Sequence, residues 1–319
     1  MKQQRTISPC PICGNYGIHS FIAKNYEFSK CQNQNCRHVY VDPMPTDAEL
    51  GVYYAKNTSG LENSDSWTMV EDYKNNPRLV HKFYEGNRIN FLRRKGYLNS
   101  NSRVLDVGCS TGMFLRVLVD QGYENVVGVD VSIEQVTHCR EVNKIRAFRD
   151  LAEIPAGEEF DLVSLYAVLE HTPNPATVLE QSVKRLKPGG HLIVDVPNYR
   201  SVYRVLSGKK WLWLIPPVHL QYFTPKSMEK LARNAGLDVS YASTKSTSTY
   251  MYIMAYHIFG LLQKEIPNTS LAASRPRTIF LACAELSVRA FLSPFSVLMR
   301  FSRTHNQIIY VFTRKQKLI

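Results

Sequence analysis

The chain has 319 residues, of which 44% are hydrophobic and 21% are charged, and its net charge is +12. This composition suits one large or two modest globular domains, and it excludes collagen-like, low-complexity and coiled-coil chains. The first residues pass directly from a basic and polar segment into a cysteine pair, which is unlike a signal peptide. A cytoplasmic location is therefore expected.

The positive charge is concentrated in the last third of the chain. From Arg200 onwards there are 17 Lys or Arg and 4 Asp or Glu, a net charge of +13, whereas residues 1–199 carry −1. This asymmetry indicates an anionic partner, which could be an anionic small-molecule or glycan acceptor, a membrane surface or a nucleic acid. The alternative is a basic surface that is simply solvated.

Four of the seven cysteines form a pattern near the N-terminus. Two short-spaced pairs, with 17 residues between them, are formed by Cys10 with Cys13 and by Cys31 with Cys36. Four thiolates at this spacing suit a structural, tetrahedral Zn²⁺ site, which predicts a zinc-ribbon module over residues 1–41. Disulfides or free thiols are the alternative, and His38 or His19 could replace one thiol.

Residues 42–100 are interpreted as a connector with N-terminal helices. Two prolines follow the ribbon, and the segment after them shows no clear periodicity. From Leu79 to Lys95, apolar residues recur at helical spacing with basic residues between them. This pattern predicts an amphipathic helix that ends at Gly96.

A strand–loop–helix–strand pattern opens the middle of the chain. An apolar strand begins at Val104, a glycine loop runs from Gly108 to Gly112, a helix continues to about Gln121, and a second strand ends at Asp130. Glycines let the backbone approach a ligand, and a carboxylate at the second strand's end can accept both hydroxyls of a ribose. The loop is not G-x-G-x-x-G, which argues against a nicotinamide or flavin dinucleotide.

The alternation of strands and helices continues downstream. Asn174 and Pro175 predict the start of one helix, and Thr224 starts another that stops at Gly236. An apolar strand, residues 192–196, lies between them. This alternation predicts a doubly wound α/β fold with a parallel sheet and a ligand at the carboxyl ends of the strands.

Four motifs in order resemble those of class I S-adenosylmethionine (SAM)-dependent methyltransferases. The first two are Asp106-Val-Gly-Cys-Ser-Thr-Gly112 and Val129-Asp130, with Ser110 where many members have glycine. The others are the segments FDLVSLYAVLEHTPNP, from Phe160, and LKPGGHLIVDVPN, from Leu186. The resemblance spans roughly residues 103–240.

The resemblance implies a Rossmann-like sheet of seven strands. Its core would occupy residues 101–245. A helical insertion over 246–305, facing substrate or membrane, would precede the last strand within 306–319. The last two strands are expected at 237–242 and 307–313, with the final one as an antiparallel edge strand.

The cofactor-binding residues implied by the resemblance fall into three groups. The methionine part of SAM would be surrounded by Asp106, Gly108, Ser110 and Gly112. The ribose would be held by Asp130, and the adenine would contact Val131, Asp150 and Leu151. Tyr166, at the end of the fourth strand, completes the predicted set.

Three residues are candidates for the catalytic step. Methyl transfer from a sulfonium is an in-line displacement, so the protein aligns donor and acceptor and removes a proton from a hydroxyl or carbon acid. His171 follows the fourth strand, and His219 and Tyr222 lie where the resembled fold places a substrate loop. Each could instead be a hydrogen-bonded structural residue.

The acceptor is only partly constrained by the sequence. The fourth strand lacks the Asn/Asp-Pro-Pro-Tyr motif of nucleobase amino methylation and the Pro-Cys pair of pyrimidine carbon methylation. The ribbon and both histidine segments resemble methyltransferases of polysaccharide and secondary-metabolite pathways, which implies a sugar or lipid-linked glycan acceptor. The alternatives are a ribosomal RNA methyltransferase that docks through the ribbon and a non-catalytic SAM-binding protein.

A basic and aromatic segment, residues 208–217, precedes His219. It contains Lys209, Lys210, Trp211 and Trp213, and such a combination is typical of a membrane interface. This pattern predicts a peripheral contact with an anionic membrane or a lipid-linked pyrophosphate. The alternative is that the tryptophans belong to the core.

Overall fold

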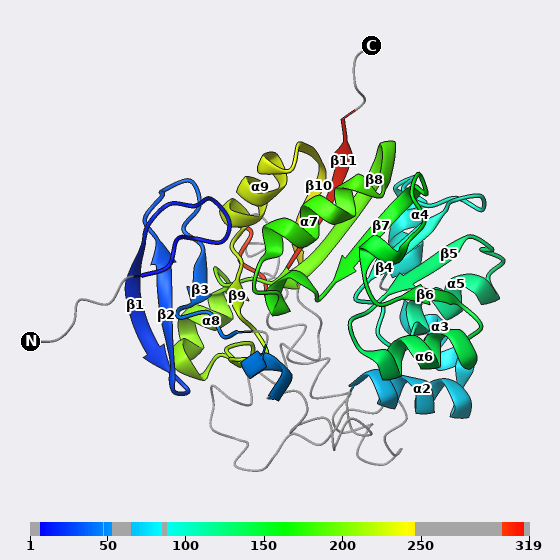
Figure 1. Cartoon of the computed structure of the whole chain (residues 1–319), viewed down its shortest axis with the longest axis horizontal. Helices are drawn as coiled ribbons and strands as arrows, with labels where there is room; N and C mark the ends of the chain where they lie inside the picture. Colours follow the sequence, from blue (N-terminus) through cyan, green and yellow to red (C-terminus); the bar gives the residue numbers. More distant parts are fainter. Residues whose placement is uncertain (1–6, 47, 53–64, 85–87, 246–301, 316–319) are drawn as a thin grey trace, which may run out of the picture.

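The computed structural model describes residues 7–46, 48–52, 65–84, 88–245 and 302–315, which form two sheets and their covering helices (Figure 1). The predicted helical insertion lies almost entirely outside the described residues. Among the described helices, none has the length and hydropathy required to cross a bilayer.

The larger sheet has seven strands in the order β10-β11-β8-β7-β4-β5-β6. The strands are β4 (Val104–Val107), β5 (Val126–Val129), β6 (Arg146–Phe148), β7 (Phe160–Tyr166), β8 (Leu186–Pro197), β10 (Leu237–Lys245) and β11 (Gln307–Arg314). Strands β4 to β8 pair in parallel, and β11 is antiparallel to both of its neighbours. The predicted doubly wound, seven-stranded sheet is confirmed.

The position of the last strand differs from the prediction, because β11 lies between β8 and β10 and the edge strand is β10. Side chains on both faces of β11 are buried, with Tyr310 and Phe312 on one face and Val311 on the other. Strand β10 is mostly exposed or half-buried along its length. Strands in the middle of a sheet are covered on both faces, which suits the apolar side chains of β11. A strand with one exposed face, such as β10, is suited to the edge of the sheet.

Helices cover both faces of the larger sheet (Figure 1). One face packs against α3 (Pro77–Tyr84), α4 (Asn90–Arg94), α5 (Met113–Asp120) and α6 (Ile133–Glu141). The other packs against α7 (Pro175–Lys184) and α9 (Pro225–Asn234). Both predicted helix starts are capped, since Asn174 accepts from the Thr177 amide at 3.2 Å and Thr224 forms a capping box with Ser227.

The region before the glycine loop contains more helix than the sequence indicated. The predicted helix over 79–95 is two helices, α3 and α4, and α2 (Asp65–Asn75) precedes them. A tertiary contact explains α2, because the Tyr73 hydroxyl donates to Asp120 Oδ2 at 2.6 Å and His81 contacts the same oxygen at 2.8 Å. Such long-range bonds stabilise a helix without leaving a periodic apolar pattern.

The N-terminal module forms a smaller, antiparallel sheet of four strands in the order β1-β2-β3-β9. Three strands come from the predicted ribbon, namely β1 (Gly17–Ala23), β2 (Tyr26–Cys31) and β3 (Val39–Val41). The fourth, β9 (Gln221–Tyr222), comes from the segment after the larger sheet's central strands, with Val39 opposite Tyr222. The ribbon is therefore completed by the segment that carries His219.

Short helices connect these parts. The α-helix α8 (Val202–Ser207) and the 3₁₀ helices η3 (Leu151–Glu153), η4 (Leu169–His171) and η5 (Gly208–Lys210) lie in loops at the carboxyl ends of strands. The Leu220 amide donates to the carbonyl of Glu170 at 2.7 Å, which joins β9 to η4. The ribbon and η4 are thus held against the same short strand.

One buried side chain links three of these segments. Gln221, 2% exposed, donates to the carbonyls of Thr172 and Pro173 at 3.0 and 3.1 Å. Its Oε1 contacts His38 Nε2 at 2.9 Å. The β9 segment is therefore fixed to the ribbon on one side and to the loop after β7 on the other.

We predict that Gln221→Ala lowers the free energy of unfolding by about 2–3 kcal/mol, because the His38 ring and two backbone carbonyls lose their hydrogen bonds to a buried side chain. Urea unfolding followed by circular dichroism measures the change. Gln32→Ala, an exposed position of the ribbon, serves as control and should change stability by less than about 0.5 kcal/mol. A Gln221→Ala protein as stable as this control contradicts the role given to Gln221.

Candidate functional site

The glycine loop after β4 has no room for side chains at two positions. Gly108 and Gly112 adopt φ of +71° and +81°. A Cβ atom at Gly108 would lie 2.5 Å from Val168, and one at Gly112 would lie 2.6 Å from Cys139. The backbone of this loop is therefore fixed close to the loop after β7, and both glycines are required by conformation and by space.

Asp130 stands at the carboxyl end of β5 and organises the glycine loop. Its Oδ2 accepts from the Ser110 amide at 2.9 Å, and its Oδ1 accepts from the Ser132 amide at 3.0 Å. Each oxygen has a further lone pair, so the carboxylate can accept additional hydroxyl donors. Burial raises the pKa of Asp130. The next residue, Val131, is 82% exposed and presents an apolar surface beside this carboxylate.

The residues predicted for the adenine edge lie in η3 and at its start. Asp150 caps this helix by accepting from the Ala152 amide at 2.7 Å. Leu151 is buried in the core that covers the sheet. Because η3 follows β6, the neighbour of β5, these residues lie along the same edge of the sheet as Asp130.

Two buried hydroxyl groups in the site have no partner among the described residues. They are Ser110 Oγ, in the glycine loop, and Tyr166 Oη, at the end of β7. An unpaired buried hydroxyl is costly, so such atoms point to a bound ligand or water. Gly108 has no side chain and lets a ligand approach the backbone, and Asp130 can accept hydrogen bonds from ribose hydroxyls. These features and the two unpaired hydroxyls fit a nucleoside-containing ligand such as SAM.

An arginine that the sequence analysis missed lies in this site. The guanidinium carbon of Arg88 is 3.9 Å from the centre of the Tyr166 ring, and the rings of Tyr84 and Phe114 lie within 6 Å of it. Asp106 is 4% exposed and accepts from the Ser164 hydroxyl at 2.6 Å. Burial raises the pKa of Asp106 to about 6, and the charge of Arg88 opposes this shift.

The signal for Arg88 was present in the sequence but ambiguous. Four basic residues alternate with apolar ones between positions 82 and 94, and periodicity treats them all as the solvated face of a helix. Only the folded chain shows that Arg88 turns towards the aromatic rings of the site.

The two predicted histidines come together although 48 positions separate them. The rings of His171 and His219 are 4.8 Å apart and nearly perpendicular. The Nδ1 atom of His171 contacts the Val218 carbonyl at 2.8 Å, and that of His219 contacts the Trp213 carbonyl at 2.9 Å. A carbonyl only accepts, so each Nδ1 carries the proton and each Nε2 carries the lone pair.

Burial controls the protonation of this pair and of the neighbouring Glu170. It lowers the pKa of His171, and it lowers the pKa of His219 to about 3 with a further contribution from His171. Burial also raises the pKa of Glu170, which is 1% exposed, to about 8. Both imidazoles are therefore neutral at pH 7.

Tyr222 and Trp211 occupy places that differ from their predicted roles. The Tyr222 hydroxyl donates to the His219 carbonyl at 2.9 Å in a buried environment, so it holds the histidine segment. Trp211 is 1% exposed and packs against Tyr199 and Tyr222. The predicted membrane anchor is wrong for this tryptophan, because its ring is part of the core.

A pocket of about 130 Å³ lies beside this core. It is lined by Phe21, Tyr199, Arg204, Gly208, Lys209, Trp211 and Leu214. Its walls come from both β1 and the segment that contains α8 and η5. Two of the lining residues, Arg204 and Lys209, are cationic, so the pocket suits a ligand with negative charge.

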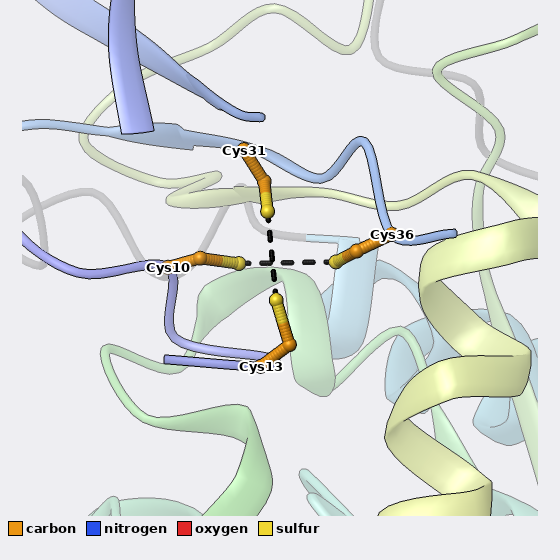
Figure 2. A group of neighbouring side chains, drawn as sticks. All are labelled: Cys10, Cys13, Cys31 and Cys36. Carbon is orange, nitrogen blue, oxygen red and sulfur yellow. Dashed lines mark hydrogen bonds between the residues drawn. The ribbon is translucent and has the colours of Figure 1, made fainter. Parts of the chain in front are cut away.

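The four predicted zinc ligands converge in the ribbon (Figure 2). The sulfur atoms of Cys10 and Cys36 are 3.8 Å apart, and those of Cys13 and Cys31 are 3.5 Å apart. Zn–S bonds of about 2.3 Å in a tetrahedron place sulfur atoms about 3.8 Å apart, so the donor set fits zinc.

Neither histidine considered as a substitute ligand belongs to this cluster. His38 bonds to Gln221, and His19 lies in β1 with its Nδ1 3.6 Å from a Glu27 carboxylate oxygen. Among the residues that the structure describes, four thiols alone form the cluster, and four ligands complete a tetrahedral site.

Comparisons with known proteins agree with this geometry. A family described as a methyltransferase domain matches residues 79–242. The ubiquinone biosynthesis O-methyltransferase of Hydrogenovibrio crunogenus is 30% identical over 164 residues, which cover 47% of this chain and 67% of that protein. The enzyme of the same name from Xylella fastidiosa is 32% identical over 166 residues, or 47% of this chain and 66% of that protein.

A solved structure shows the same fold at low sequence identity. Magnesium protoporphyrin IX methyltransferase from Synechocystis PCC 6803, with bound SAH, aligns with a TM-score of 0.50 and 16% identity. The alignment covers 85% of this chain and all of that one. Together with the family match over half of the sequence and the glycine-loop geometry, this identifies the chain as a member of the class I SAM-dependent methyltransferases.

Proposed function

We propose that this methyltransferase transfers the methyl group of SAM to a hydroxyl of a small molecule. The observation that carries the proposal is the pair of neutral imidazoles, His171 and His219, at the edge of the sheet where Asp130 and the glycine loop lie. A neutral imidazole can take the proton that a hydroxyl loses when it is methylated. The two relatives named above are O-methyltransferases, which supports a hydroxyl acceptor.

Each part of SAM has a matching group in the site. Asp130 would accept the ribose hydroxyls, and Val131 with residues 150–151 would line the adenine. Arg88 would bind the carboxylate of the methionine part and Asp106 its amino group, since these side chains offer the opposite charges. When bound, SAM supplies an electrophilic methyl group on a sulfonium, and the Tyr166 ring is suited to lie beside that cation.

The acceptor class differs from the first expectation. The comparisons give no support for a sugar, a lipid-linked glycan or polysaccharide biosynthesis, and the relatives are named for ubiquinone biosynthesis. We therefore take a hydroxylated aromatic ring as the first acceptor to test, with a sugar as the second. The pocket that contains Arg204 and Lys209 favours an acceptor that also carries negative charge.

The ribbon would bind one structural Zn²⁺ through Cys10, Cys13, Cys31 and Cys36. Burial raises the pKa of Cys31 to about 12, so this thiol ionises near neutral pH only when a cation is present. Because the ribbon sheet ends in β9, zinc would stabilise the segment that carries His219.

We predict that Asp130→Ala weakens SAM binding about tenfold to a hundredfold, because a charge-assisted pair of hydrogen bonds is worth about 1.5–3 kcal/mol. Isothermal titration calorimetry measures the affinity. Asp238→Ala, at the exposed edge strand, should leave it unchanged. Equal affinities of the wild-type and Asp130→Ala proteins would exclude the ribose assignment.

We predict that Cys31→Ser removes the ion bound by the ribbon, because one of four ligands is lost. Elemental analysis of the purified protein measures zinc, and Cys139→Ser, which lies outside the cluster, is the matched control. Retention of ribbon zinc in Cys31→Ser would show that the ligand set is different.

We predict that His219→Ala lowers the rate of methyl transfer by about 10²- to 10⁴-fold while SAM affinity stays within a factor of two, because the acceptor proton loses its base. Labelled SAM is incubated in parallel with a dihydroxyphenol, a sugar nucleotide and RNA. His191→Ala, on β8, is the control. Transfer of the labelled methyl group to RNA alone would replace the small-molecule proposal with RNA methylation. Transfer to none of several acceptors would favour a non-catalytic binding protein.

A further inference from the structure

We propose that Glu170, His171 and His219 form a binding site for a divalent transition-metal ion, separate from the cysteine cluster. One carboxylate oxygen of Glu170 and one nitrogen of each ring lie within 4.8 Å of one another. Two imidazoles and one carboxylate are a donor set that binds Zn²⁺, Mn²⁺, Fe²⁺ or Co²⁺. Mg²⁺ and Ca²⁺ prefer oxygen ligands and fit this set less well.

The first argument is the isolation of the Glu170 carboxylate. The side chain is 1% exposed, and its Oε2 has no hydrogen-bond partner among the described residues. No cation of the described chain forms an ion pair with it, whereas the neighbouring Asp195 is paired with Lys245. Ionisation of a buried carboxyl group without a counter-charge is strongly unfavourable, and a bound cation removes that cost.

The second argument is the orientation of the imidazoles. Both rings donate Nδ1–H to a backbone carbonyl, at 2.8 Å for His171 and 2.9 Å for His219. Metal-binding histidines commonly make such a bond with the nitrogen that does not bind the ion, because it fixes the ring and the tautomer. The lone pair of each Nε2 is then available to the ion.

The third argument is the rigidity of the backbone that presents these ligands. Glu170 and His171 are consecutive residues of η4, and His219 directly precedes Leu220, whose amide bonds to the Glu170 carbonyl at 2.7 Å. The Trp213 ring stacks on His219 with centres 5.7 Å apart. The donor atoms lie within 4.8 Å of one another, so ligand–metal distances of about 2.0–2.2 Å require these separations to shrink by roughly 1 Å.

Three protein ligands leave coordination positions open, which is typical of catalytic rather than structural sites. A divalent ion lowers the pKa of a hydroxyl that it binds, as it does for water. In the proposed methyl transfer, the ion would orient the acceptor hydroxyl and lower its pKa. Because both Nε2 lone pairs would then be coordinated, the hydroxyl would lose its proton to water and not to a free imidazole. This use rests on the proposed function, whereas the existence of the metal site does not.

The test is the metal content of the full-length protein after equilibration with Zn²⁺ and removal of unbound ion. The wild-type protein should hold about two ions per chain, one in each cluster. Glu170→Gln, which keeps the side-chain shape, and His219→Ala should each hold about one, and Cys31→Ser should keep the ion at Glu170. His191→Ala, a histidine outside the cluster, should hold two.

Two results would overturn the site. One is a wild-type protein with a single ion that Cys31→Ser removes, and the other is a Glu170→Gln protein that keeps two ions. Should His219→Ala fail to fold, Co²⁺ is added to wild-type protein that holds one zinc per chain, in which the cysteine cluster is filled and the Glu170 cluster is empty. Its visible spectrum should show nitrogen and oxygen ligands without thiolate-to-cobalt charge transfer, and an unchanged spectrum excludes the site.

These measurements need neither SAM nor an acceptor. Failure of methyl transfer to every acceptor would therefore refute the proposed function and leave the metal site standing. Conversely, normal O-methylation by a protein that binds one ion per chain would refute the metal site alone.

Discussion

The pairing of β3 with β9 is the constraint on which the rest of the site depends. Two residues of the C-terminal half, Gln221 and Tyr222, complete a sheet that otherwise belongs to the N-terminal ribbon. The same segment is bonded through Leu220 to the backbone of Glu170. The strand pairing and this bond leave little freedom for His219, which directly precedes Leu220.

This arrangement explains why a closed cysteine cluster occurs in an enzyme whose cofactor site lies elsewhere. A sheet of four short strands has a small core, for which a metal ion held by the four thiols would compensate. The ribbon in turn supports the β9 segment, to which Gln221 adds bonds to the carbonyls of Thr172 and Pro173. The cofactor half of the site has its own rigid frame in Gly108, Gly112 and Asp130.

The sequence predicted the cofactor half better than the acceptor half. The residues from Val104 to Asp130 are local in the chain, so a strand, a glycine loop and a strand-end carboxylate could be placed by spacing alone. The four thiols were predicted for the same reason. The order of the last two strands was predicted wrongly, because it depends on which of them, β10 or β11, is buried on both faces. That burial is decided by packing against distant elements.

Long-range contacts account for the other differences. His171 and His219 were each identified, but their contact and the isolation of Glu170 arise only when β9 docks on η4. Arg88 looked like one of several solvated basic residues until the fold placed it over Tyr166. Trp211 looked interfacial because two lysines precede it in the sequence, whereas its ring is buried in the core.

Hydrogen exchange with and without a zinc chelator tests the link between the ribbon and the acceptor segment most directly. Removal of the metal should accelerate exchange of amides in β3 and at residues 219–222, while the amides of β4 and β5 in the larger sheet stay protected. Unchanged protection at residues 219–222 after complete loss of zinc would contradict the account.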